Sequence, residues 1–107
     1  MITQSQINDV VDRIVKNYDP EKIIMFGSLA RGEQNENSDL DLLVIKKTDV
    51  PANKRGIEVW NYLLSSRYMF PIDILVFTPN EIEKDKNNSY TFIYDAMSSG
   101  KTVYEKK

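Results

Sequence analysis

Two aspartates separated by one residue, Asp39 and Asp41, introduce an apolar run that continues to Ile45. In a β-strand, residues i and i+2 point to the same face, so the two carboxylates would lie side by side. Aspartate is a poor strand former, and a carboxylate near a core is costly unless something neutralises it. An isolated Asp-x-Asp can also simply end a polar loop, so this pair alone does not define a site.

A third carboxylate, Asp73, interrupts the apolar segment 71–77. An unpaired charge there would be expensive, so we expect Asp73 either to lie at an exposed edge or to meet a partner. The neighbouring sequence offers no pattern of arginine or lysine for that role. A divalent cation shared by Asp39, Asp41 and Asp73 would neutralise all three, provided that the strand carrying Asp73 lies beside the strand carrying Asp41.

The composition restricts both the chemistry and the partners. The 107 residues include no cysteine and no histidine, so thiolate and imidazole ligands are excluded and a metal site must use oxygen ligands, which favours Mg²⁺ or Mn²⁺. The 14 basic and 16 acidic residues form no long run of one sign, and we expect no direct nucleic-acid binding. With no apolar stretch of membrane-spanning length and no signal peptide at the N-terminus, we expect a cytoplasmic protein without membrane contact.

A glycine-serine turn, Gly27-Ser28, follows the apolar run 23–26. Glycine allows the backbone to approach a ligand closely, and the segment after it can expose amide N–H groups to phosphate. Ser28 could add a hydroxyl donor, and Arg31 a guanidinium that suits phosphate oxygens. Taken alone, Ser28 could instead be a helix N-cap and Arg31 a solvated surface residue.

The remaining pattern predicts the elements that position these residues. Thr3 and Gln6 resemble a capping box at the start of an amphipathic helix that ends at Asp19-Pro20. Segments 23–26, 40–45 and 71–77 are predicted strands, and 102–104 a small edge strand. Further helices are predicted after Pro51, with Ile57, Trp60, Leu63 and Leu64 on one face; after Thr78, with a second capping box; and through Tyr90, Ile93, Ala96 and Met97 up to Gly100.

Strands that alternate with helices predict an α/β fold in which helices cover a small sheet, and the length suits one domain over residues 1–107. The order Gly27-Ser28, ten residues, then Asp39-x-Asp41 resembles the signature of the polymerase-beta-type nucleotidyltransferase superfamily. The longer string "GSLARGEQNENSDLDLLV" is similar to the minimal nucleotidyltransferases, which are often paired with HEPN-domain proteins in toxin–antitoxin modules. This resemblance implies a polymerase-beta-like fold with a small mixed sheet.

The resemblance also implies an activity. A nucleoside monophosphate would pass from ATP or another nucleoside triphosphate to an acceptor hydroxyl, with Mg²⁺, or Mn²⁺, bound by Asp39, Asp41 and Asp73. Gly27 and Ser28 would hold the outer phosphates, and Arg31 would contact either phosphate or a neighbouring carboxylate. Because the chain offers no evident surface for a polymer or a drug, the implied acceptor is a protein, by resemblance a tyrosine of a HEPN toxin.

Two other functions stay open. The chain could be a binding module that neutralises a HEPN toxin by contact alone, or an aminoglycoside nucleotidyltransferase. Substitution of Asp73 separates catalysis from contact, since catalysis alone should need it. A drug-modifying enzyme would need an acidic binding lobe, for which the chain leaves no residues.

Overall fold

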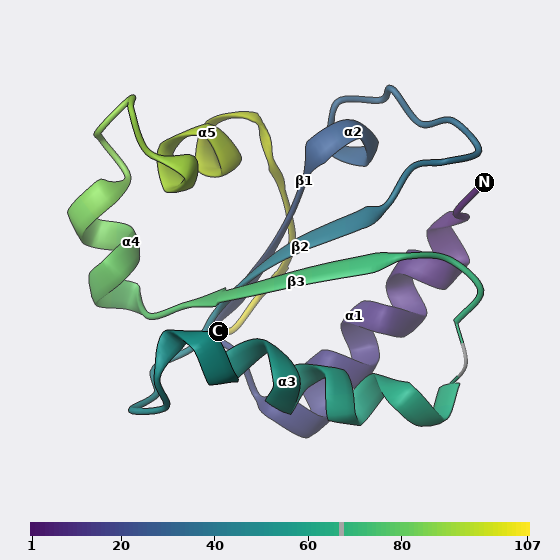
Figure 1. Ribbon diagram of the computed structural model, residues 1–107, viewed down its shortest axis with the longest axis horizontal. Coiled ribbons are helices and arrows are strands. Elements are labelled where there is room, and N and C mark those ends of the chain that lie inside the picture. The colour runs from purple at the N-terminus through teal and green to yellow at the C-terminus, as the bar shows by residue number, and fades with distance from the viewer. Residues whose placement is uncertain (67) are drawn as a thin grey trace.

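A computed structural model describes residues 1–66 and 68–107 and shows a four-stranded sheet with helices on both faces (Figure 1). The strands are β1 (Lys22–Phe26), β2 (Leu40–Ile45), β3 (Ile72–Phe77) and β4 (Lys101–Glu105). The helices are α1 (Gln4–Tyr18), α2 (Gly27–Ala30), α3 (Ala52–Leu63), α4 (Pro79–Asp85) and α5 (Phe92–Ser99), with a 3₁₀ turn at Leu64–Ser66. None of these described helices combines the length and apolar character that crossing a bilayer requires.

The sheet is mixed, with strand order β3-β2-β1-β4. Strand β1 runs antiparallel to β2 and to β4, whereas β2 and β3 are parallel. One face packs against α1 and α3 through residues such as Val10, Leu42 and Val59, and the other packs against α4 and α5 through Leu43 and Ile93. The predicted α/β fold with a small mixed sheet is therefore confirmed.

The helix boundaries follow the capping signals. Thr3 and Gln6 form the predicted capping box at α1, whose C-cap Asp19 adopts a left-handed conformation, φ 51°. A second predicted box forms at α4, where Thr78 Oγ1 accepts a hydrogen bond from the Glu81 amide and Glu81 Oε1 accepts one from the Thr78 amide. Helix α5 begins at Phe92, so Tyr90 lies in the preceding turn rather than in the helix, and Gly100 is the C-cap.

The buried face of α3 differs from the prediction. Arg55, Val59 and Leu63 are buried, whereas Ile57 is 63% exposed and Trp60 37% exposed, and Leu64, just beyond the helix, is also exposed. Arg55 can be buried because its Nη1 lies 2.7 Å from Glu81 Oε1 and its Nε donates to the Val50 carbonyl oxygen at 2.7 Å. A guanidinium whose hydrogen bonds are made within the protein thus occupies a position on the buried face of the helix, where an apolar residue would be expected.

This packing predicts unequal losses of folding stability for two substitutions on α3. Leu63→Ala should lower the free energy of unfolding by about 2 to 5 kcal/mol, because a side chain that is only 1% exposed leaves a cavity. Ile57→Ala should change it by about 0.5 kcal/mol or less, because Ile57 is mostly in solvent. Urea unfolding of both variants measures the difference, and equal costs would contradict the observed orientation of α3.

Candidate active site

Neighbouring strands bring the three predicted aspartates together. Asp41 on β2 pairs with Asp73 on β3 in the parallel register, and Asp39 immediately precedes β2. One carboxylate oxygen from each of the three lies within 4.8 Å of the others. The condition set by the sequence, that the strand of Asp73 lies beside that of Asp41, is met.

The setting of Asp73 corrects one part of the sequence argument. Strand β3 alternates, with Ile72, Ile74 and Val76 buried and Asp73 and Leu75 exposed. Since β3 is also an edge strand, Asp73 is solvated and carries a smaller desolvation cost than its apolar neighbours in the sequence suggested. Asp73 therefore has the exposed edge setting that the sequence left open, and it also lies in the carboxylate cluster, where a divalent cation would be its partner.

No lysine or arginine of the described residues forms a salt bridge with Asp39, Asp41 or Asp73. The pKa of Asp41 is raised to about 6, first by burial, then by a hydrogen bond and charge repulsion from Asp73 and repulsion from Asp39, while Arg31 acts in the opposite direction. Three oxygen donors at this spacing, with like charges that no salt bridge within the described residues neutralises, suit a hard divalent ion such as Mg²⁺ or Mn²⁺.

The raised pKa predicts a pH dependence for the metal-free protein. Because folded Asp41 binds its proton more tightly than the unfolded chain does, its contribution to stability is fully present below about pH 4 and is lost as the pH rises through about 6. Asp41→Asn should therefore stabilise the protein relative to wild type at pH 7.5 but much less at pH 4.5. Thermal unfolding in EDTA measures this, with the exposed Asp12→Asn as the control, whose difference from wild type should not follow this pattern.

Gly27 packs directly against the cluster. Its φ of +77° lies in the region that side chains disfavour, and a Cβ built on it would lie 2.2 Å from Asp41 Oδ2. Glycine thus serves both the turn after β1 and the close approach of this turn to a carboxylate. The sequence explained Gly27 through ligand approach, and the structure adds Asp41 as an internal reason.

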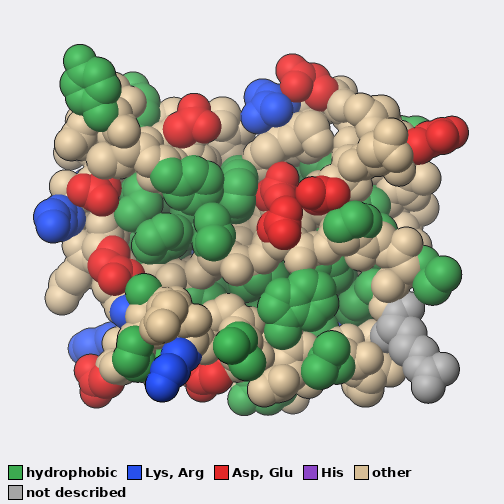
Figure 2. All heavy atoms as spheres, in the orientation of Figure 1, with side chains coloured by type: hydrophobic (Ala, Val, Ile, Leu, Met, Phe, Trp, Pro, Cys, Tyr) green, Lys and Arg blue, Asp and Glu red, His purple; other side chains and the backbone are tan. Residues whose placement is uncertain are grey.

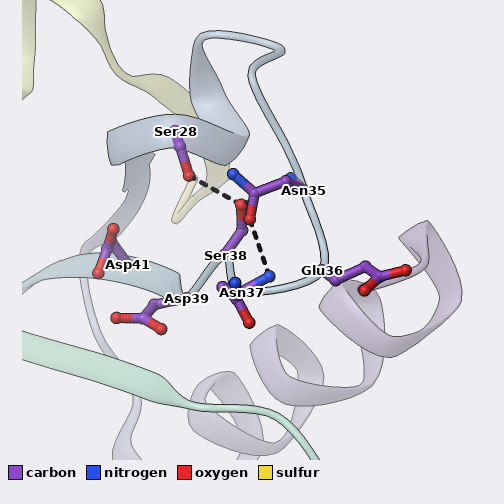
Figure 3. A pocket seen from close by; sticks show the side chains of 7 residues that line it. All are labelled: Ser28, Asn35, Glu36, Asn37, Ser38, Asp39 and Asp41. Atoms are coloured by element: carbon purple, nitrogen blue, oxygen red, sulfur yellow. Dashed lines mark hydrogen bonds between the residues drawn. The ribbon is translucent and has the colours of Figure 1, made fainter.

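A cleft of about 580 Å³ leads from the Gly-Ser turn to the carboxylates (Figure 3). It is lined by Ser28, by the loop residues Asn35, Glu36, Asn37 and Ser38, and by Asp39 and Asp41. Its polar lining and its position beside the carboxylate cluster suit a charged, hydrated ligand such as a metal-bound phosphate chain.

Ser38 is a residue of the cleft that the sequence argument missed. It is only 9% exposed; its Oγ accepts a hydrogen bond from the Asn35 amide at 2.9 Å and lies 3.2 Å from Ser28 Oγ, which donates to it. Ser38 therefore ties the loop to the Gly-Ser turn directly before Asp39. A serine in a polar run carries no sign of burial, so composition could not identify it.

The two other predicted phosphate ligands have different surroundings. Ser28 is not a helix N-cap, since the N-cap of α2 is Phe26, without a side-chain hydrogen bond. Its hydroxyl faces the cleft. Arg31 follows α2, and its Nε lies 3.1 Å from Glu33 Oε2 in an exposed ion pair outside the cleft lining.

A mixed sheet that presents clustered carboxylates beside a polar cleft suits metal-dependent transfer of phosphoryl or nucleotidyl groups. The comparison with known families agrees, because residues 5–96 match the nucleotidyltransferase domain, and the chain belongs to this family. The resemblance to minimal nucleotidyltransferases is confirmed.

Relatives in sequence and structure are of the same kind. One predicted protein adenylyltransferase of Methanocaldococcus jannaschii is 38% identical over 56 residues, which are 52% of this chain and 54% of that relative. A second from the same organism is 36% identical over 67 residues, or 59% of this chain and 77% of the relative. The chain thus spans about half the length of the first of these relatives.

Two solved structures share the fold. A toxin–antitoxin crystal structure with AMP-PNP has a TM-score of 0.67 at 21% identity and covers 94% of this chain and 73% of that chain. A predicted nucleotidyltransferase from Sulfolobus solfataricus has a TM-score of 0.64 at 18% identity, and the match covers 94% of this chain and 78% of that chain. At these identities the likeness establishes the architecture.

Proposed function

We propose that this protein transfers AMP from ATP to a hydroxyl of a partner protein, and that it is the antitoxin of a HEPN toxin–antitoxin pair. The observation that carries the proposal is the cluster of Asp39, Asp41 and Asp73 at the end of the cleft that Ser28 lines. Membership of the nucleotidyltransferase family supports nucleotidyl transfer, and the relatives named as protein adenylyltransferases support AMP and a protein acceptor.

Each part of the chain has a defined task in this reaction. Gly27 and Ser28 hold the outer phosphates in the cleft, which places the α-phosphate at the carboxylates. Asp39 and Asp41 bind the catalytic cations, and Asp73, the more exposed of the three, completes the site and accepts the proton of the attacking hydroxyl. When bound by these carboxylates, Mg²⁺ or Mn²⁺ supplies charge neutralisation at the phosphates and lowers the pKa of the attacking hydroxyl.

The same comparisons support the kind of partner. A toxin–antitoxin crystal structure with AMP-PNP shares this fold with a TM-score of 0.67, which supports both a toxin partner and a nucleotide ligand for this chain. The HEPN class of the toxin rests on the resemblance of the string 27–44 to minimal nucleotidyltransferases.

Intact-mass spectrometry tests the proposal. The neighbouring reading frame is expected to encode the HEPN-domain partner. Incubated with this protein, ATP and Mg²⁺, that partner should gain one or more AMP residues in mass. Omitting ATP or adding EDTA should remove the gain. If no protein gains AMP and the toxin is nevertheless neutralised, contact alone is the function.

A further inference from the structure

Four apolar side chains form a surface beside the carboxylate cluster, which we call the aromatic platform: Phe26, Leu75, Phe77 and Phe92. The Phe92 ring packs edge-on against Phe26 with centroids 5.2 Å apart and stacks on Phe77 at 6.3 Å. Yet Phe92 is 44% exposed and Leu75 41% exposed. Large apolar side chains left this accessible in one place are typical of a binding surface.

The platform lies beside the aspartates of the candidate site. Phe26 pairs with Asp41 across β1 and β2, so their side chains share a face of the sheet. Leu75 and Phe77 follow Asp73 on that face in steps of two residues, each about 6.6 Å along the strand. Figure 2 shows hydrophobic side chains gathered beside the central acidic cluster.

The cleft lies on the opposite side of the same cluster. Its loop residues 35–38 precede Asp39 and β2 in the chain, whereas the platform residues Leu75 and Phe77 lie farther along the parallel strand β3. Along the strand direction the order is therefore loop cleft, carboxylates, then Leu75 and Phe77. The three aspartates separate the loop side of the cleft from this part of the platform, while Phe26 lies level with Asp41.

Nucleotidyl transfer is an in-line displacement, in which the attacking oxygen enters opposite the leaving group. On the proposed function, the β- and γ-phosphates occupy the cleft beside Ser28, so the leaving pyrophosphate departs on that side. The acceptor oxygen must then approach the α-phosphorus from the side of the platform. In-line geometry thus assigns the two surfaces to different substrates.

We propose that the aromatic platform is the acceptor-binding surface and that its occupant is an apolar protein segment carrying a tyrosine. The tyrosine ring packs on Phe92 and Leu75, and its O–H reaches the α-phosphorus beside Asp73. The phenolic oxygen forms a bond to the α-phosphorus, the bond from that phosphorus to the bridging oxygen breaks, and pyrophosphate leaves with the bonding electrons. The phenolic proton passes to Asp73 and then to water.

The composition of the platform favours this occupant over others. Its four side chains carry no charge, so they form no ion pair with the phosphates of a nucleic acid or with the ammonium groups of a cationic drug. A tyrosine ring fits because an aromatic ring gains both burial and edge or offset stacking against phenylalanine, while its hydroxyl stays at the polar border. The adenine of ATP could stack there as well, and the test separates the two.

The test uses Leu75→Thr and Phe92→Thr, since the smaller threonine removes most of the apolar surface and adds a hydroxyl. With the HEPN-domain protein as acceptor, each variant should raise the KM for that protein about tenfold or more and change kcat by less than about threefold. The Kd for ATP, measured by calorimetry without acceptor, should stay within about twofold of wild type. Matched controls are Leu64→Thr and Tyr90→Thr, which replace exposed side chains outside the platform and should leave both constants unchanged.

Three results would overturn the inference. The first is an unchanged KM for the partner protein in both variants. The second is a loss of ATP affinity equal to the rise in KM, which would make adenine the occupant of the platform. The third is transfer of AMP by the wild-type protein to a nucleic acid rather than to a protein. If wild type transfers no AMP at all, the proposed function fails separately. The affinity of the HEPN-domain protein for the same variants, measured by calorimetry, then tests whether it docks on the platform. A tenfold loss of affinity supports docking there, and an unchanged affinity overturns the inference.

Discussion

With Asp39 and Asp41 both replaced by asparagine, AMP transfer to the partner protein is expected to fall by about a thousandfold or more. The two carboxylates lie within a cluster whose oxygens approach to 4.8 Å, and asparagine preserves their shape while removing the charges that would hold the cations. Loss of about 4 kcal/mol of transition-state stabilisation corresponds to this factor. Transfer rates from intact-mass time courses measure the effect.

The fold of this variant should survive, which makes the result interpretable. Removing two like charges relieves repulsion around Asp41, so the metal-free variant should unfold at the same temperature as wild type or higher at pH 7.5. Asp12→Asn combined with Asp49→Asn is a control that changes the net charge equally at exposed positions outside the site. A double variant that transfers AMP as wild type does would remove the carboxylates from the mechanism.

Local signals in the sequence predicted those parts of the fold that depend on neighbours in the chain. The boxes at Thr3 and Thr78 form because their partners lie three residues away, and β2 spans the predicted residues 40–45. The orientation of α3 could not be predicted in the same way. Ile57 and Trp60 form an apolar stripe as regular as the buried one, and the burial of Arg55 depends on Glu81, which is 26 residues away in the chain.

The same distinction between local and long-range determinants holds for the candidate site. The spacing of Asp39 and Asp41 predicts that they share a face, because strand geometry is local. The place of Asp73 required β2 and β3 to be parallel neighbours in a register that aligns residues 32 positions apart. The argument from the residues could state this only as a condition, and the family resemblance implied it. Neither the buried hydroxyl of Ser38 nor the meeting of Phe92 with Phe26 has a local signal, since both arise from the way the chain folds back on itself.

Gly27→Val is expected to have the largest effect of any single substitution at the turn, on ATP binding and on folding together. A Cβ at this position would lie 2.2 Å from Asp41 Oδ2, and the φ of +77° is strained for a β-branched residue. We expect the free energy of unfolding to fall by about 2 to 4 kcal/mol through overpacking and backbone strain. Either the turn or the Asp41 carboxylate must move, and both belong to the proposed ATP site, so ATP affinity should fall below detection by calorimetry.

A second substitution separates the two effects of Gly27→Val. Combining it with Asp41→Gly removes the side chain that the new Cβ meets, so part of the lost stability should return, whereas ATP affinity should not, because the turn still carries the valine and the site has lost a carboxylate. Urea unfolding of the single and double variants gives the coupling between the two positions, and calorimetry gives the affinity. Additive losses of stability in that cycle would mean that the contact between Gly27 and Asp41 does not constrain the turn.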